Sequence, residues 1–80
     1  MDSTKFAETI CKAVYLQSIK SGKTIDQANQ NVSVMASVAS NYFQASWNYE
    51  LAPTKRNELK LRSNRINFIK LCKKFKINVA

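Results

Sequence analysis

The sequence contains no histidine, one glycine, one proline, two cysteines and five acidic residues among its 80 positions. Without histidine, the chain lacks the side chain that most often transfers protons near neutral pH. The five acids, at positions 2, 8, 26, 50 and 58, are scattered and form no obvious catalytic pair. We therefore predict a protein that is not an enzyme and has no catalytic residue.

The scarcity of glycine and cysteine also argues against several cofactor sites. Residues 21–24 (SGKT) resemble only the last part of a phosphate-binding loop, because Gln17 stands where that loop needs its first glycine and no strand is predicted before it. We interpret the fragment as a helix end followed by a turn. Cys11 and Cys72 cannot complete a four-ligand zinc site, so we expect two free thiols, with a disulfide between the first and last helices as the alternative. No metal and no cofactor is predicted.

The length of the chain predicts one small domain, residues 1–80, with a thin core. A chain of this size buries only about 60% of its unfolded surface, so a partner or a second copy could add stability. The N-terminus shows no signal-peptide pattern, and Asn, Gln and Ser interrupt the uncharged stretch 27–49, so it is not a membrane span. These features favour a cytoplasmic protein.

Two helices are predicted before the proline. Residues 3–21 repeat apolar side chains at helical spacing, and Gly22 suits the position after a helix end. Residues 24–51 begin with the capping box Thr24 to Gln27 and would form a central helix roughly 40 Å long. This helix carries two apolar series and therefore needs two neighbours. The first series is Ile25, Ala28, Val32, Met35, Ala39, Tyr42 and Ser46, and the second is Val34, Val38, Ala45 and Tyr49.

Pro53 ends the central helix, and Thr54 can cap a third helix over residues 54–76. At about 100° per residue, this helix separates an apolar side from a basic side. The apolar side holds Leu61, Phe68, Leu71, Cys72 and Phe75, and the basic side holds Lys55, Arg56, Arg62, Lys70, Lys73 and Lys74. The sequence as a whole thus predicts an all-α, three-helix arrangement.

The net charge of +8 lies entirely in the last third of the chain. Residues 1–52 carry equal numbers of basic and acidic residues, whereas residues 53–80 carry nine basic residues and one acid. Several cations on one side of a rigid helix can neutralise several phosphates, which favours DNA or RNA as the partner. Asparagine and arginine can also read base edges. The predicted binding residues are Lys55, Arg56, Arg62, Asn64, Arg65, Asn67, Lys70, Lys73 and Lys74.

The alternative hypothesis is a protein-interaction module, an inhibitor or adaptor that binds an acidic protein surface. Trp and Tyr dominate interface energetics, and an uncharged helix face suits an interface or a homodimer. The predicted interface residues are Tyr42, Trp47, Tyr49, Asn41 and Gln44. A solvated charged face, a helix-turn-helix motif and binding to a membrane surface are less favoured, the last because the core needs the apolar side of the third helix. The overall composition is typical of accessory regulators from phages or mobile elements.

Overall fold

The structure, a computed structural model, describes residues 3–77, with side chains from Lys5 onward. Helix α1 spans Ser3–Lys20, α2 spans Ile25–Leu51 and α3 spans Lys55–Lys74, and there is no strand within the described residues. The all-α, three-helix prediction is confirmed, and the helix ends lie within two residues of the predicted ones.

The ends of α1 and α2 are fixed by the signals that the sequence carries. Gly22 has a positive φ of 87°, which allows the chain to turn sharply after α1. The Thr24 hydroxyl accepts a hydrogen bond from the Gln27 backbone N–H at 3.1 Å, and the Gln27 Oε1 accepts one from the Thr24 N–H at 3.0 Å. This reciprocal capping box starts α2 immediately after the turn.

The turn between α2 and α3 follows from Pro53. A proline disfavours the α conformation in the residue before it, and Ala52 is indeed extended, with a φ of −144°. The Thr54 hydroxyl then accepts a hydrogen bond from the Asn57 backbone N–H at 3.2 Å and caps α3. The two helices therefore form an antiparallel hairpin.

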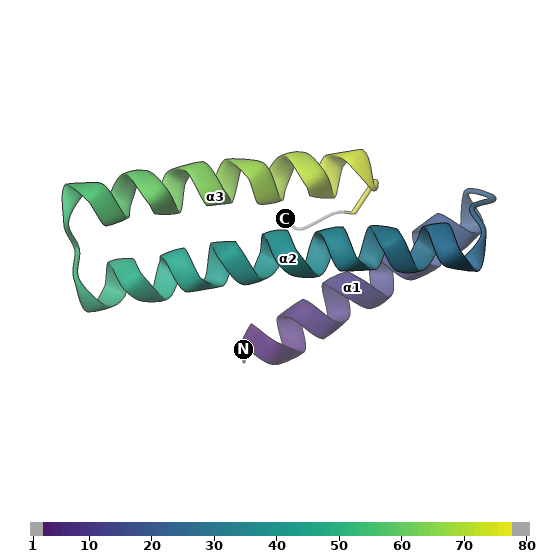
Figure 1. The fold of residues 1–80 in the computed structure, drawn as a ribbon, viewed down its shortest axis with the longest axis horizontal. Helices are drawn as coiled ribbons and strands as arrows, with labels where there is room; N and C mark the ends of the chain where they lie inside the picture. Colours follow the sequence, from purple (N-terminus) through teal and green to yellow (C-terminus); the bar gives the residue numbers. More distant parts are fainter. Residues whose placement is uncertain (1–2, 78–80) are drawn as a thin grey trace.

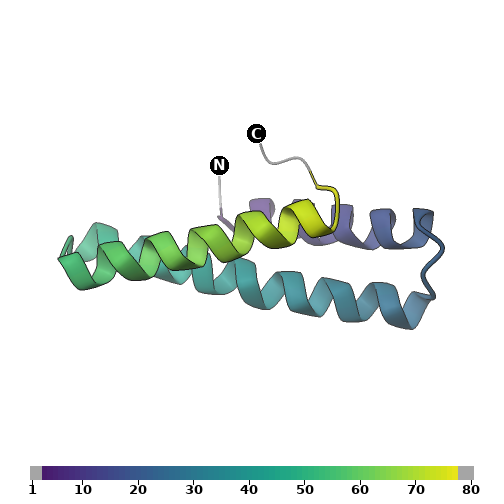
Figure 2. The ribbon, with the colours of Figure 1, turned by 90° about the horizontal axis from the view of Figure 1, so that it is seen from above.

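Helix α2 is the centre of the molecule, as expected. Helix α3 runs along it, and α1 crosses it obliquely, beginning near the middle of α2 and ending at the α1–α2 turn (Figure 1). Seen from above, the three helices lie alongside one another over the middle part of α2, and the hairpin of α2 and α3 extends beyond α1 (Figure 2). The molecule is elongated, with extents of 44 × 22 × 21 Å. Its two ends thus have different packing.

The hydrophobic core lies where side chains of all three helices meet. Met35 from α2, Val14 from α1 and Cys72 from α3 are the largest fully buried side chains. Four aromatic rings pack together at the edge of this core. The ring centroids of Phe6 and Phe43 are 5.5 Å apart, and those of Tyr42 and Phe68 are 5.2 Å apart. The complete buried cluster is Ile10, Val14, Met35, Ala39, Phe68 and Cys72.

Two residues of the predicted apolar series of α2 are exposed instead. Ile25 is 62% exposed and Val34 is 48% exposed. Ile25 lies in the first turn of the helix, and Val34 is about 100° around the helix from Met35, outside the arc that α1 and α3 cover. The remaining members of both series are buried or half-buried. Within residues 3–77, no helix combines the length and the hydropathy that a membrane span requires.

Candidate nucleic-acid interface

Helix α3 packs its apolar side against α2 and turns its basic side to solvent. Phe68 and Cys72 are buried, whereas the cations on the opposite side are exposed. The basic face of α3 consists of Lys55, Arg56, Lys60, Arg62, Lys70, Lys73 and Lys74. Sequence reasoning missed Lys60, although its spacing of four residues from Arg56 places both on one side of a helix.

The basic face is long enough to contact a nucleic acid over several nucleotides. Arg56 and Lys74 are eighteen positions apart, which corresponds to about 27 Å along a helix. This distance equals about eight base-pair steps of duplex DNA. A rigid helix can therefore hold several cations beside successive phosphates at once.

One carboxylate lies within this face. Glu58 Oε1 is 3.3 Å from Arg62 Nη2, and Glu58 Oε2 is 3.8 Å from Lys55 Nζ. Exposed pairs of this kind stabilise a helix by only about 0.3–0.5 kcal/mol each, so a phosphate can replace the carboxylate. No other cation of the face has a carboxylate within 4.0 Å among the described residues. These five are Arg56, Lys60, Lys70, Lys73 and Lys74.

Two apolar side chains are exposed on the same side of α3. Leu59 is 50% exposed and Ile66 is 46% exposed, and their seven-residue spacing places them on one line between the cations. Apolar groups in such a position can contact thymine methyl groups. The surface therefore offers contacts besides those to phosphate.

The three other predicted binding residues of α3 lie in different places. Arg65 is on another side of the helix, where it lines a depression with Phe6, Phe43 and Phe68. Asn64 is half-buried beside α2, and its Nδ2 donates a hydrogen bond to the Lys60 carbonyl at 2.8 Å. Asn67 is exposed and has no side-chain hydrogen bond within the described part of the chain. Of the two predicted base readers, Asn67 is thus the available one.

An amide groove lies between α2 and α3 near the hairpin turn. It is a depression of about 190 Å³ lined by Asn41, Gln44, Asn48, Asn57, Asn64, Lys60 and Ala45. The Gln44 Nε2 donates to the Asn48 Oδ1 at 3.0 Å, and the Asn57 Nδ2 donates to the Asn48 and Ala52 carbonyls at 3.3 and 2.8 Å. Each carbonyl also accepts from a backbone N–H, Asn48 from Ala52 at 2.9 Å and Ala52 from Thr54 at 2.8 Å, so the Asn57 side chain adds a second hydrogen bond to each. Sequence reasoning missed this residue, because only the hairpin brings it to Asn48.

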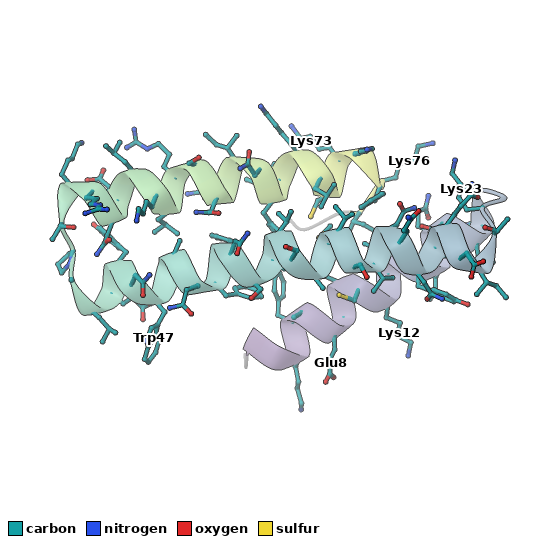
Figure 3. All side chains as sticks on the ribbon, in the orientation of Figure 1. Glu8, Lys12, Lys23, Trp47, Lys73 and Lys76 are labelled. Atoms are coloured by element: carbon teal, nitrogen blue, oxygen red, sulfur yellow. The ribbon has the colours of Figure 1, made fainter. Side chains whose placement is uncertain are left out.

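The predicted aromatic interface is divided by the fold. Tyr42 is half-buried and packs on Phe43 and Phe68. Trp47 is 59% exposed and points away from α3 (Figure 3), whereas Tyr49 is half-buried. Asn41 and Gln44, the polar members of the predicted interface, line the amide groove. Trp47 is therefore the most accessible of the predicted aromatic anchors.

Both cysteines are free thiols, and Cys72 is buried while Cys11 is half-buried. Burial raises the pKa of each thiol, since an apolar surrounding disfavours the charged thiolate. Neither thiol is thus activated as a nucleophile near neutral pH. Within residues 3–77 there is no group of three or more His, Cys, Asp or Glu side chains that could hold a metal ion.

Comparison of the chain with protein-family models, with curated proteins and with solved structures gave no match.

Proposed function

We propose that the protein is a non-enzymatic, nucleic-acid-binding regulator that contacts phosphates through the basic face of α3. The observation that carries this proposal is the row of five cations, Arg56, Lys60, Lys70, Lys73 and Lys74, that have no carboxylate partner in the described residues. Counterion release from the nucleic acid supplies the affinity, and Asn67 is the side chain that can contact a base edge.

The charge distribution supports a polyanion as the ligand. The first 52 residues have no net charge, so the positive potential is concentrated on one helix. A folded core holds that helix rigid, which reduces the conformational entropy lost on binding. A backbone of evenly spaced phosphates matches such a row better than a protein surface with a few isolated carboxylates.

The test is a titration of the full chain into fluorescently labelled duplex DNA, single-stranded DNA and RNA, followed by anisotropy at several salt concentrations. Contacts with about six phosphates give a slope of about −5 for the logarithm of the association constant against the logarithm of salt concentration on duplex DNA. Absence of binding to all three nucleic acids at low salt would overturn the proposal.

A matched pair of variants controls for net charge. Lys70→Gln with Lys73→Gln removes two cations of the basic face, and the expected slope decreases by about 2. Lys5→Gln with Lys12→Gln removes the same charge from exposed positions of α1, and the expected slope is unchanged. If both double variants lose the same affinity and the same part of the salt slope, overall charge, and not the basic face, determines binding. Circular dichroism confirms that each variant remains helical.

A second candidate function is binding to a protein with an acidic surface, and the exposed Trp47 favours it. Leu51, one turn further along α2, is 68% exposed, and no charged residue lies between Asp26 and Glu50. An exposed tryptophan beside an exposed leucine is typical of an interaction hot spot. A pull-down from nuclease-treated lysate, with wild type and Trp47→Ala side by side, separates the candidates. A partner that resists nuclease and is lost with Trp47→Ala supports the protein-binding function, and a partner lost with nuclease supports the first.

A further inference from the structure

A second positively charged feature lies at the end of the molecule opposite the hairpin turn. There the α1–α2 turn and the end of α3 enclose a depression of about 380 Å³. Lys23 from the turn and Lys74 and Lys76 from the end of α3 line it, together with Ser21 and Asn31. Figure 3 shows Lys23 and Lys76 at this end, with Lys73 further back along α3. The fold thus gathers cations that are about fifty positions apart in the sequence.

The C-terminal ends of α1 and α3 have similar backbone caps, and these caps determine where Lys23 and Lys76 lie. The Lys23 N–H donates to the Ser18 carbonyl at 3.0 Å after Gly22, and the Ile77 N–H donates to the Cys72 carbonyl at 2.8 Å after Lys76. Both are the bonds of a left-handed helix cap, in which one residue adopts positive φ. In α1 that residue is Gly22, whereas in α3 it is Lys76, with a φ of 57°.

A lysine in this conformation is unfavourable compared with glycine, because its Cβ crowds the backbone. Ile77 follows Lys76 and packs against the hydrophobic core, so the cap is held in place and the lysine side chain remains exposed. The cap therefore fixes the backbone of Lys76 and leaves its side chain in solvent at the depression.

The electrostatics of the depression favour an anion. The C-terminal ends of α1 and α3 each contribute about half a negative charge, and the N-terminal end of α2 contributes about half a positive charge. The positive charge of the three lysines is larger than the net partial negative charge of these helix ends. None of the three has a carboxylate within 4.0 Å in the described part of the chain. Asn31 already donates to the Ser18 Oγ at 3.1 Å, which fixes its side chain at the wall of the depression.

We propose that Lys23, Lys74 and Lys76 form a phosphate-binding site that extends the basic face of α3 onto the α1–α2 turn. This site differs from a phosphate-binding loop, since Gly22 serves as a helix cap and no strand precedes it in the described residues. The ligand is a phosphate group, either in a nucleic-acid strand or free in solution. The strand as a source depends on the proposed function, and free phosphate does not.

The test is a titration of the isotopically labelled full chain, followed by amide chemical shifts. Inorganic phosphate and pyrophosphate form one arm, and an oligonucleotide with and without a 5′-phosphate forms the other. Both arms are expected to shift the amides of residues 21–24 and 74–77. No shift at these amides with any of the four ligands would overturn the proposal.

Two variants remove the cations without loosening the fold. Lys76→Gly removes one charge and the unfavourable φ together, so it should leave Tm unchanged or raise it while weakening phosphate binding. Lys23→Gln removes the second charge, and Lys12→Gln, on the far side of α1 (Figure 3), is the matched control. With Lys23→Gln and Lys76→Gly combined, the salt slope for duplex DNA is expected to decrease by about 2.

These variants also separate the two proposals. If phosphate shifts disappear in the double variant while no nucleic acid binds the wild type, the phosphate site stands and the proposed function fails. If the double variant binds phosphate and duplex DNA as the wild type does, while Lys70→Gln with Lys73→Gln weakens DNA binding, the site fails and the proposed function stands.

Discussion

The two ends of α2 are stabilised in different ways. At the core end, which comprises Ala28–Phe43 of α2, side chains of three helices exclude water around Met35. At the hairpin end, residues 44–64, only α3 covers α2, and amide hydrogen bonds centred on Asn57 join the helices. The smaller apolar contact leaves Trp47 and Leu51 exposed. The comparison indicates that stability resides at one end and accessible side chains at the other.

The largest expected effect comes from emptying the core end. Met35→Ala should lower the free energy of unfolding by about 2–5 kcal/mol and Phe68→Ala by about 3–5 kcal/mol, since each leaves a cavity among three helices. A domain of this size has roughly 4–12 kcal/mol in total, so either variant approaches unfolding. Urea denaturation followed by circular dichroism measures the change. Leu59→Ala, at a 50% exposed position, is the control and should change stability by less than about 0.5 kcal/mol.

An intermediate effect is expected at the hairpin end. Asn57→Ala removes the donor to the Asn48 and Ala52 carbonyls and should cost about 1–2 kcal/mol. Asn67→Ala removes the same chemical group from an exposed position of the same helix and should cost less than about 0.5 kcal/mol. If the two variants unfold at the same urea concentration, the amide hydrogen bonds do not hold the hairpin end together.

Alkaline pH should loosen the core end before the hairpin end. Burial raises the pKa of Cys11 and Cys72 above the unfolded value, so the unfolded chain releases these protons first. The contribution of the two protonated thiols to the free energy of unfolding is fully present below about pH 8.5. It is lost as the pH rises through the pKa values of the folded chain. Hydrogen exchange resolved by residue, measured from pH 7 to 10, is expected to show protection lost first in the helical turns around these cysteines. Cys72→Ala, less stable at neutral pH, should show a weaker alkaline dependence.

The smallest effect on stability is expected at Trp47. Because the side chain is 59% exposed, Trp47→Ala should change the free energy of unfolding by less than about 0.5 kcal/mol. It is also the only tryptophan, so the fluorescence of the native chain should resemble that of a water-exposed indole and be quenched readily by acrylamide. A blue-shifted, protected emission would indicate that a second copy or another partner covers this end.

The helices could be predicted from the sequence because their signals are local. The capping box at Thr24, the glycine at position 22 and Pro53 with Thr54 each act within four residues, and the structure has helix ends at each of them. The separation of cations from Phe68 and Cys72 in α3 follows from helical periodicity alone. The charge excess of the last third is likewise a property of the sequence.

Contacts between distant residues could not be predicted in this way. The sequence does not show that α1 begins near the middle of α2, and this position decides that Tyr42 packs into the core while Trp47 is exposed. The hydrogen bonds of Asn57 and the meeting of Lys23 with Lys76 depend on how helices pack, which arises from side-chain shapes far apart in the chain. Sequence thus determined the helices and their charged side, through short-range hydrogen bonding and periodicity. Tertiary packing decided which of those side chains remain in solvent and which cations share a site.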